Sequence, residues 1–406
     1  MTSIGVPLPT EEVTPATLAW LERLVGFDTV SAHSNLALID AVRAEADEHG
    51  LGYEITHDDS AQKANILISL PASDGTTSAG VVLSGHTDVV PAPPSGWTSD
   101  PFLLTRRDDR LYGRGTADMK GFLAVVLGAL PMFAAVRRRQ ALHIALSYDE
   151  EVGCFGVPAL LDGLLAKHGA QSICIIGEPT SMTVTMGHKA VVMLRITFRG
   201  RAAHSSTTND GVNAVEYAAR ATAAIRDIAD GYRTNGPFDP SCDVPYTTVS
   251  VNVVSGGSAA NIVAEHCEIV CEIRTIPGQQ AGDVIAEVAG VAEAIEQRMR
   301  RESAESTVTV DQLALIPALD APVDSIAAAY SRALGALPGD LKVSFGTEGG
   351  FFASTGISTV VCGPGDMAQA HRPDEYIEVS QLVECERFMR ALATDLGRDD
   401  SGGGMG

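Results

Sequence analysis

The chain has 406 residues, of which 45% are hydrophobic and 20% charged, and its formal net charge is −22 at pH 7. This composition is typical of a globular protein and excludes extended disorder, and the length favours two domains. The acidic balance argues against a nucleic-acid-binding protein, which needs clustered Lys and Arg. It suits a site at which carboxylates surround cations.

The seven cysteines are scattered, with no C-x-x-C pair, and an odd number cannot pair fully within one chain. We therefore expect reduced thiols and a cytoplasmic protein. The first residues lack the basic and apolar pattern of a signal peptide. We expect no apolar run of membrane-spanning length and no membrane partner.

The first half of the chain alternates helices with strands. Amphipathic helices are predicted over residues 14–27 and 35–49, and a long apolar helix over 120–135. The predicted strands are short apolar runs; they are 65–70, 81–85, 142–148 and 172–177. Because strands alternate with helices, the sequence predicts an α/β fold with a mostly parallel sheet.

From residue 191 the pattern changes to strands in which polar and apolar residues alternate. The predicted elements are, in order, strand 191–199, helix 212–229, strands 247–254 and 267–276, helix 281–301 and strand 307–315. The order β-α-β-β-α-β is the ferredoxin-like arrangement. We expect the two helices to cover one face of the sheet.

The chain then returns to its first pattern. A helix is predicted over 323–336, a strand over 358–362 and a final helix over 380–396. The first domain is therefore expected to be discontinuous, with a compact domain inserted in it. The expected segments are 1–187 and 317–406 for the first domain and 188–316 for the insert.

Acids and histidines follow four of the predicted buried strands. They are His86 and Asp88 after 81–85, Glu150 and Glu151 after 142–148, Glu178 after 172–177, and His371 beyond a Gly/Pro loop after 358–362. Ligands of open parallel sheets bind beyond the carboxyl ends of the strands. Buried carboxylates are normally paired, protonated or bound to metal. The pattern therefore predicts one metal site.

The spacing also indicates separate roles for neighbouring residues. A metal-binding histidine commonly donates its second ring N–H to a carboxylate, and Asp88 is placed to accept it from His86. Asp118 lies in a glycine-rich turn before the long apolar helix, where glycines allow close backbone approach. Neighbours in an extended segment point to opposite sides, so Glu150 and Glu151 should differ in role.

Six motifs, in this order, resemble those of the di-zinc aminoacylase and carboxypeptidase (M20-type) family of metallohydrolases. They are His86-Thr-Asp88, Gly115-Thr-Ala-Asp-Met-Lys-Gly121, Asp149-Glu-Glu151, Gly177-Glu-Pro-Thr180, Arg201-Ala-Ala-His204-Ser and Ala370-His371-Arg-Pro-Asp-Glu375. The resemblance extends from about residue 15 to 396. Within the family, three stretches are most similar to acetylornithine deacetylases: Gly187-His-Lys189, Ser344 to Gly350 and Gln369 to Tyr376.

The resemblance implies a mostly parallel-sheet zinc-hydrolase catalytic domain with an inserted ferredoxin-like lid and dimerisation domain. It implies two Zn²⁺ ions, for which Co²⁺ can substitute, and a homodimer formed through the insert. The implied metal ligands are His86, Asp118, Glu151, Glu178 and His371, with Asp118 as the bridge. Glu150 would be the general base, with Asp88 beside His86. His204 would reach the active site of the partner subunit and stabilise the oxyanion.

The resemblance also implies substrate-binding residues. Asn261 and Arg274 would hold the α-carboxylate of a small N-acyl amino acid, since Arg binds a carboxylate in a bidentate manner. Thr347 and Gly349 would line the pocket, and Glu348 would face the cationic end of ornithine. The implied reaction removes acetate from N2-acetyl-L-ornithine, a step of arginine biosynthesis. The alternative substrates are succinyl-diaminopimelate, another N-acyl amino acid or a dipeptide.

The sequence leaves other interpretations open. A non-catalytic binding protein of this fold would lack a ligand or the base, and a structural zinc module would have saturated metal coordination and no pocket. Among single residues, Glu150 is alternatively an acid neutralised by a nearby Lys, and His204 only the cap of a turn. Arg274 is alternatively an exposed strand charge, and Asn261 a turn residue.

Overall fold

The structure is a computed structural model that describes residues 12–339 and 341–398. Contacts within the chain divide it into two compact units, which are described separately. The first unit consists of Met1–Met186, Ala321–Asp340 and Thr347–Gly406, and the second of Gly187–Asp320 and Leu341–Gly346. The expected insert did not include Leu341–Gly346. This segment belongs to the second unit because Lys342 forms ion pairs there with Asp239 and Asp320.

A six-stranded sheet forms the centre of the first unit. Its order is β1 (Gly52–His57), β2 (Ala64–Leu70), β6 (Leu142–Ser147), β3 (Val81–His86), β7 (Ile173–Pro179) and β17 (Ser358–Gly363). The four strands from β6 to β17 are parallel, and β1 and β2 add an antiparallel edge. The expected α/β class and the mostly parallel sheet are confirmed. Strand β1 was missed because its residues are half-buried and form no apolar run.

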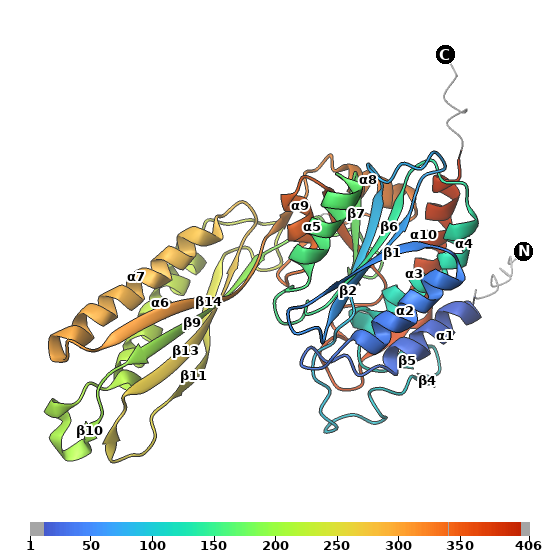
Figure 1. Cartoon of the computed structure of the whole chain (residues 1–406). Helices are drawn as coiled ribbons and strands as arrows, with labels where there is room; N and C mark the ends of the chain where they lie inside the picture. Colours follow the sequence, from blue (N-terminus) through green and yellow to red (C-terminus); the bar gives the residue numbers. More distant parts are fainter. Residues whose placement is uncertain (1–11, 340, 399–406) are drawn as a thin grey trace, which may run out of the picture. The chain divides into compact units, whose positions relative to one another are not determined.

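Helices lie on both sides of this sheet (Figure 1). They are α1 (Pro15–Val25), α2 (Leu36–Glu48), α3 (Gly121–Gly128), α4 (Leu130–Ala135), α5 (Val157–His168), α8 (Ile326–Ala333), α9 (Gly349–Ser354) and α10 (Val379–Leu396). Leu21 and Leu24 of α1, Leu123 and Leu127 of α3, and Leu392 of α10 belong to one buried core. A separate small sheet joins β4 (Thr105–Arg107), β5 (Arg110–Tyr112) and β18 (Tyr376–Glu378).

The expected long helix over 120–135 is interrupted. A π-helical turn, η1 (Thr116–Lys120), precedes α3, and Pro131 stands in the first turn of α4, where it needs no backbone N–H donor. The stretch Thr116–Ala135 is long and apolar enough to cross a membrane, so the expectation that no run reaches that length was wrong. However, 72% of its apolar window is buried inside the structure, and α3 packs against α1 and α10 as a core helix does.

The second unit has the expected ferredoxin-like fold. Its antiparallel sheet has the order β11 (Thr248–Gly256), β13 (His266–Thr275), β9 (Ala190–Arg199) and β14 (Thr307–Ile316). Helices α6 (Ala214–Asn235) and α7 (Ala281–Glu302) cover one face (Figure 1). Alternate residues of β13, Cys267 to Ile273, are fully buried and share a core with Val284 and Val288 of α7. The alternation in the sequence therefore marks the helix-covered face.

Shorter elements complete the second unit. Strands β10 (Ala203–His204) and β12 (Ile262–Val263) pair with each other, and a 3-10 turn, η2 (Ser205–Asp210), follows β10. A three-stranded sheet joins β15 (Leu319–Asp320), β8 (Gly187–His188) and β16 (Lys342–Val343).

A buried histidine of β6 makes the stability of the first unit pH-dependent. His143 is fully buried between Ser69 Oγ, 2.9 Å from its Nδ1, and the carbonyl oxygen of Thr77, 2.8 Å from its Nε2. Burial lowers the pKa of His143 from 6.5 to about 4. The unfolded chain therefore takes up this proton first, and the free energy of unfolding should fall as the pH decreases from 6.5 towards 4.

We predict that the variant His143→Gln loses this contribution. Below pH 6.5, the difference in unfolding free energy between the wild type and His143→Gln should change by about 1.4 kcal/mol per pH unit. Urea unfolding between pH 7 and pH 4.5 measures the change. The matched control is His57→Gln, at an exposed histidine of β1, which should follow the wild type. Parallel curves for the wild type and His143→Gln would contradict the prediction.

Candidate metal centre

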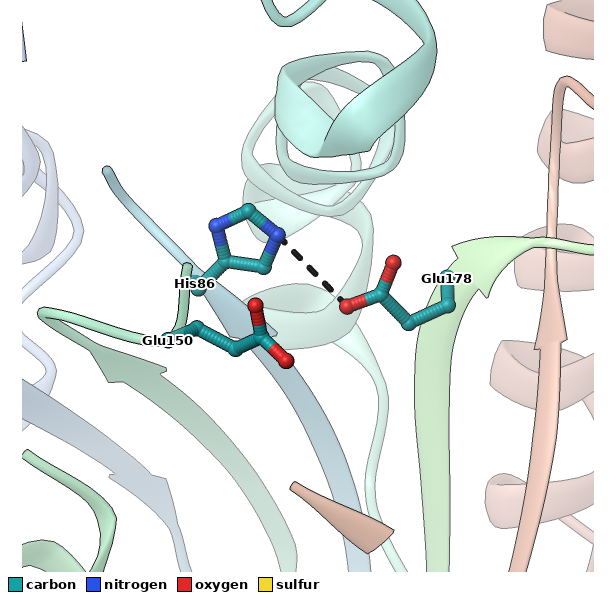
Figure 2. Close-up of side chains that lie close together, drawn as sticks. All are labelled: His86, Glu150 and Glu178. Carbon is teal, nitrogen blue, oxygen red and sulfur yellow. Dashed lines mark ion pairs between the residues drawn. The ribbon is translucent and has the colours of Figure 1, made fainter. Parts of the chain in front are cut away.

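The carboxyl ends of three neighbouring parallel strands bring His86, Glu150 and Glu178 together. His86 ends β3, Glu178 lies near the end of β7, and Glu150 follows β6. Figure 2 shows the three side chains pointing towards one another, and each has a ligand atom within 4.8 Å of the others. The distance from His86 Nε2 to Glu178 Oε1 is 3.5 Å. All three residues are buried.

Asp118 lies between two histidines. Its Oδ1 is 3.0 Å from Nε2 of His86, and its Oδ2 is 3.2 Å from Nε2 of His371. The same nitrogen of His371 is 3.0 Å from Oε2 of Glu151. The five expected ligands therefore lie together, and Asp118 directs one oxygen to each half of the set. This is the arrangement that a carboxylate bridging two cations requires.

The backbone of the glycine-rich turn places Asp118 at this position. Gly115, which precedes η1, has φ +83°, and a Cβ atom there would lie 2.7 Å from Cγ1 of Val89. Only glycine fits this left-handed and crowded position. Within η1, Asp118 has φ −122° and ψ 94°, which is not helical, so the π-helical turn is irregular at the residue that carries the carboxylate.

Asp88 organises the acidic turn more than it orients His86. Its Oδ1 accepts the backbone N–H of Glu150 at 3.1 Å, and its Oδ2 accepts that of Glu151 at 3.3 Å. The Ser31 hydroxyl donates to the same Oδ2 at 2.6 Å. His86 Nδ1 is 3.6 Å from the Asp88 carboxylate but only 2.9 Å from its backbone carbonyl, which is the nearer acceptor. The expected contact to the carboxylate is thus secondary.

The acid pair lies in a turn and not in an extended strand. Strand β6 ends at Ser147, Asp149 has φ +57°, and Gly153 donates its backbone N–H to the carbonyl of Glu150. The expectation that Glu150 and Glu151 lie in an extended segment was therefore wrong. The two side chains nevertheless have different partners: Glu150 groups with His86 and Glu178, whereas Glu151 groups with His86 and Asp118 and also contacts His371.

No lysine neutralises Glu150 among the described residues. The nearby Lys63 forms its ion pair with Asp149, at 2.6 Å between Nζ and Oδ1. Oε1 of Glu150 instead accepts a long hydrogen bond, 3.6 Å, from the thiol of Cys154. The alternative in which Glu150 is one half of a lysine ion pair is therefore excluded for the described part of the chain.

The cluster holds more acid than its two histidines balance. Burial raises the pKa of Glu150 and of Glu178 well above the usual value, and burial beside Asp118 raises that of Glu151 to about 7. Hydrogen bonds from His371 to Asp118 and Glu151 raise the pKa of His371 to about 10. Four buried carboxylates cannot all be ionised beside two imidazoles unless further positive charge is present.

Divalent cations fit this cluster. Among the described residues, Oε1 of Glu151 is a buried oxygen without a hydrogen-bond partner, which is a free ligand position. The donors are imidazole nitrogens and carboxylate oxygens, a set that zinc and neighbouring transition metals accept. The seven cysteines are free and buried, and none belongs to the two groups of candidate ligands.

Three of the expected residues belong to the second unit. His204 is exposed, and its Nδ1 accepts the backbone N–H of Ser206 at 3.2 Å, so it does cap the turn η2. Asn261 is exposed in the turn before β12. Arg274 is engaged within its own unit: its guanidinium pairs with Glu272 at 2.8 Å and donates to the carbonyl of Ser344 at 2.8 Å. Their roles towards a substrate stay predictions.

The expected pocket residues around α9 are buried in the first unit. Thr347 Oγ1 accepts the backbone N–H of Gly349 at 3.0 Å, and neither residue is exposed. Glu348 is fully buried and accepts hydrogen bonds of 2.9 Å from the hydroxyls of Ser84 and Ser147. The expectation that Glu348 faces a cationic group of a ligand was therefore wrong, because its carboxylate is enclosed by β3 and β6.

Glu375 received no role from the sequence pattern, although it closes the motif that begins at Ala370. It is 1% exposed, and its carboxylate accepts hydrogen bonds from the backbone N–H groups of Gly115, Ala117 and Asp118. Arg114 pairs with it at 2.6 Å. Its position four residues after His371 was visible in the sequence, but its burial was not.

Comparison with known proteins agrees with this geometry. Residues 82–395 match the model of peptidase family M20/M25/M40. An acetylornithine deacetylase from Myxococcus xanthus is 33% identical over 93% of this chain and 97% of its own length. A solved M20 family metallo-carboxypeptidase from Sulfolobus solfataricus has the same fold, with a TM-score of 0.73, 15% identity and coverage of 94% of this chain and 99% of that one.

A dinuclear metal-binding peptidase of the M20 family from Bacillus subtilis also shares the fold. Its TM-score is 0.62 at 14% identity, and the match covers 94% of this chain and 97% of that one. The family match covers most of the chain, and the site contains the cluster of ligands that such chemistry needs. The chain therefore belongs to peptidase family M20/M25/M40 and is a metal-dependent hydrolase.

Proposed function

We propose that the protein hydrolyses N2-acetyl-L-ornithine to L-ornithine and acetate, a step of arginine biosynthesis, in the cytoplasm. The choice of substrate rests on the 33% identity to an acetylornithine deacetylase, which extends over 93% of the chain. The choice of amide hydrolysis rests on one observation, the convergence of four carboxylates and two histidines next to the carboxyl ends of the parallel strands β3, β6 and β7. The native metal is proposed to be zinc, with cobalt as a functional substitute.

The proposed ligands divide into two sets that share Asp118. His86 and Glu178 would hold one cation, and Glu151 and His371 the other. In support of this division, His86 and His371 each lie against a different oxygen of Asp118, Glu178 lies against His86, and Glu151 lies against His371. When bound, such a pair of cations polarises the amide carbonyl and lowers the pKa of a water molecule. The carboxyl group of Asp88 holds the backbone of the turn that presents Glu150 and Glu151.

Glu150 is the proposed general base. Its carboxylate is buried, lies with His86 and Glu178, and has no lysine partner among the described residues. It accepts a proton from the water that attacks the acetyl carbonyl carbon. It returns this proton to the amine nitrogen of ornithine as the C–N bond breaks. The same carboxyl group thus serves first as a base and then as an acid.

We predict that Glu150→Gln lowers kcat by roughly 100- to 10,000-fold, because the amide cannot accept the proton of water. The metal content of the variant, measured by mass spectrometry, should equal that of the wild type. The matched control is Asp149→Asn. In the wild type, Asp149 is the neighbouring acid of the same turn, and it pairs with Lys63 and not with the proposed metal ligands. Unchanged turnover of Glu150→Gln would contradict the mechanism.

A panel of substrates tests the proposed specificity. With zinc or cobalt supplied, kcat/KM should be highest for N2-acetyl-L-ornithine. The competitors are succinyl-diaminopimelate, other N-acetyl amino acids and dipeptides, which are the alternative substrates of a related hydrolase. Release of the free amine measures each reaction. A preference for a dipeptide or a succinylated substrate would replace the acetylornithine proposal and leave the metal-dependent hydrolase intact.

We also propose a homodimer that forms through the second unit and in which His204 serves the active site of the partner subunit. Two features of the second unit support the proposal. Strand β11 is an edge strand with exposed Val253 and Val254, which are 51% and 60% exposed. His204 caps its turn through Nδ1, so that Nε2 is not used by the cap.

Mixing two inactive variants tests this arrangement. His204→Ala and Glu150→Gln should each be inactive alone and sediment as twice the 42.5 kDa of the chain. After unfolding and refolding together, heterodimers should contain one complete site, which restores about a quarter of wild-type activity for random pairing. No restored activity, or a monomeric wild type, would contradict the proposal.

A further inference from the structure

Glu375 is a buried carboxylate whose four hydrogen-bond donors belong to the turn that carries Asp118. Oε1 accepts the backbone N–H groups of Ala117 and Asp118 at 2.9 and 3.1 Å. Oε2 accepts the backbone N–H of Gly115 at 3.0 Å and the guanidinium of Arg114 at 2.6 Å. Both oxygens are therefore satisfied, and the charge is compensated by Arg114, as a buried carboxylate requires.

The backbone of Glu375 is fixed in the loop that carries His371. The carbonyl of Glu375 accepts the N–H of Gly113 at 3.0 Å, and Tyr376, the next residue, begins β18, which pairs with β5. Earlier in the loop, Oδ1 of Asp374 accepts both the backbone N–H and the hydroxyl of Thr98, at 2.8 and 3.1 Å. One end of Glu375 is thus tied to the loop of His371, and the other to the turn of Asp118.

We propose that Glu375 is a positioning residue that fixes the Asp118 carboxylate relative to His371 and thereby sets the affinity of the site for its metal ions. The inference rests on the metal site of the proposed function but not on the identity of the substrate. Asp118 faces both histidines, so a shift of its turn changes the contacts of the whole ligand set. Partners behind metal ligands commonly contribute to metal affinity in this way.

The variant Glu375→Gln tests the role with an almost isosteric change. Whichever way its amide is oriented, the NH₂ group faces N–H donors, because both carboxylate oxygens accept only from such groups. The turn of Asp118 must therefore move or leave donors unpaired. We expect the Zn²⁺ dissociation constants of the chelator-treated protein, measured by calorimetric titration, to rise roughly 10- to 100-fold. His371→Ala removes a proposed ligand and shows how much Zn²⁺ affinity is lost when a ligand itself is missing.

Two controls separate positioning from charge and from stability. Asp374→Asn removes one negative charge from the same loop, but its amide oxygen can still accept from Thr98, so Zn²⁺ affinity should stay within about threefold of the wild type. Leu392→Ala truncates a fully buried residue of α10 and lowers the thermal unfolding temperature without touching the turn. The Zn²⁺ affinity of Leu392→Ala should be unchanged. If Glu375 had only a structural role, the Zn²⁺ affinity of Glu375→Gln would be unchanged as well.

The outcomes are distinct. Unchanged Zn²⁺ dissociation constants in folded Glu375→Gln would overturn the inference. If that variant is not recovered folded, Glu375→Asp takes its place, because a side chain one methylene shorter cannot reach all four donors. Wild-type Zn²⁺ affinity of Glu375→Asp would overturn the inference equally. Wild-type protein that binds Zn²⁺ but does not cleave N2-acetyl-L-ornithine would refute the proposed substrate alone. Wild-type protein that binds no Zn²⁺ would refute both the metal site and the role of Glu375.

Discussion

The first unit is organised around an excess of buried negative charge. Asp118, Glu150, Glu151 and Glu178 are held next to one another with only two imidazoles between them. Such a cluster is unfavourable in a protein interior unless cations compensate it. The surrounding structure keeps the acids in place by satisfying their backbone: Asp88 binds the N–H groups of the acidic turn, and Glu375 those of the turn of Asp118. Metal binding and the integrity of this region are therefore physically linked.

The parallel sheet explains why residues far apart in the sequence form one site. Strands β6, β3 and β7 are neighbours and point the same way, so the residues after them meet at one edge. The antiparallel sheet of the second unit has no such common end. Its expected substrate residues Asn261 and Arg274 lie in a turn and on a strand, and the guanidinium of Arg274 already has Glu272 as its partner.

Much of this could be predicted from the sequence, because apolar runs followed by acids identify buried strands and their ends. Side-chain environments that depend on tertiary contacts could not be predicted in this way. Glu348 and Glu150 are the same residue type, yet Glu348 is buried in the core, where its carboxylate accepts hydrogen bonds from two serine hydroxyls. The contacts of Glu375 were not predicted because three of its four donors are backbone N–H groups, which no residue pattern reveals. Strand β1 was missed because its half-buried residues carry no periodic signal.

The late position of β17 in the chain has a consequence for biosynthesis. Strand β17 completes the central sheet by pairing with β7. In the sequence, the whole ferredoxin-like unit lies between these two strands. The loop that follows β17 supplies His371. A nascent polypeptide emerging from the ribosome therefore presents its acidic turns long before the last imidazole is available. Contacts of such large sequence separation form slowly. The proposed cation site of Glu151 and His371 would therefore be complete only after nearly the entire chain has been translated and β17 has paired with β7.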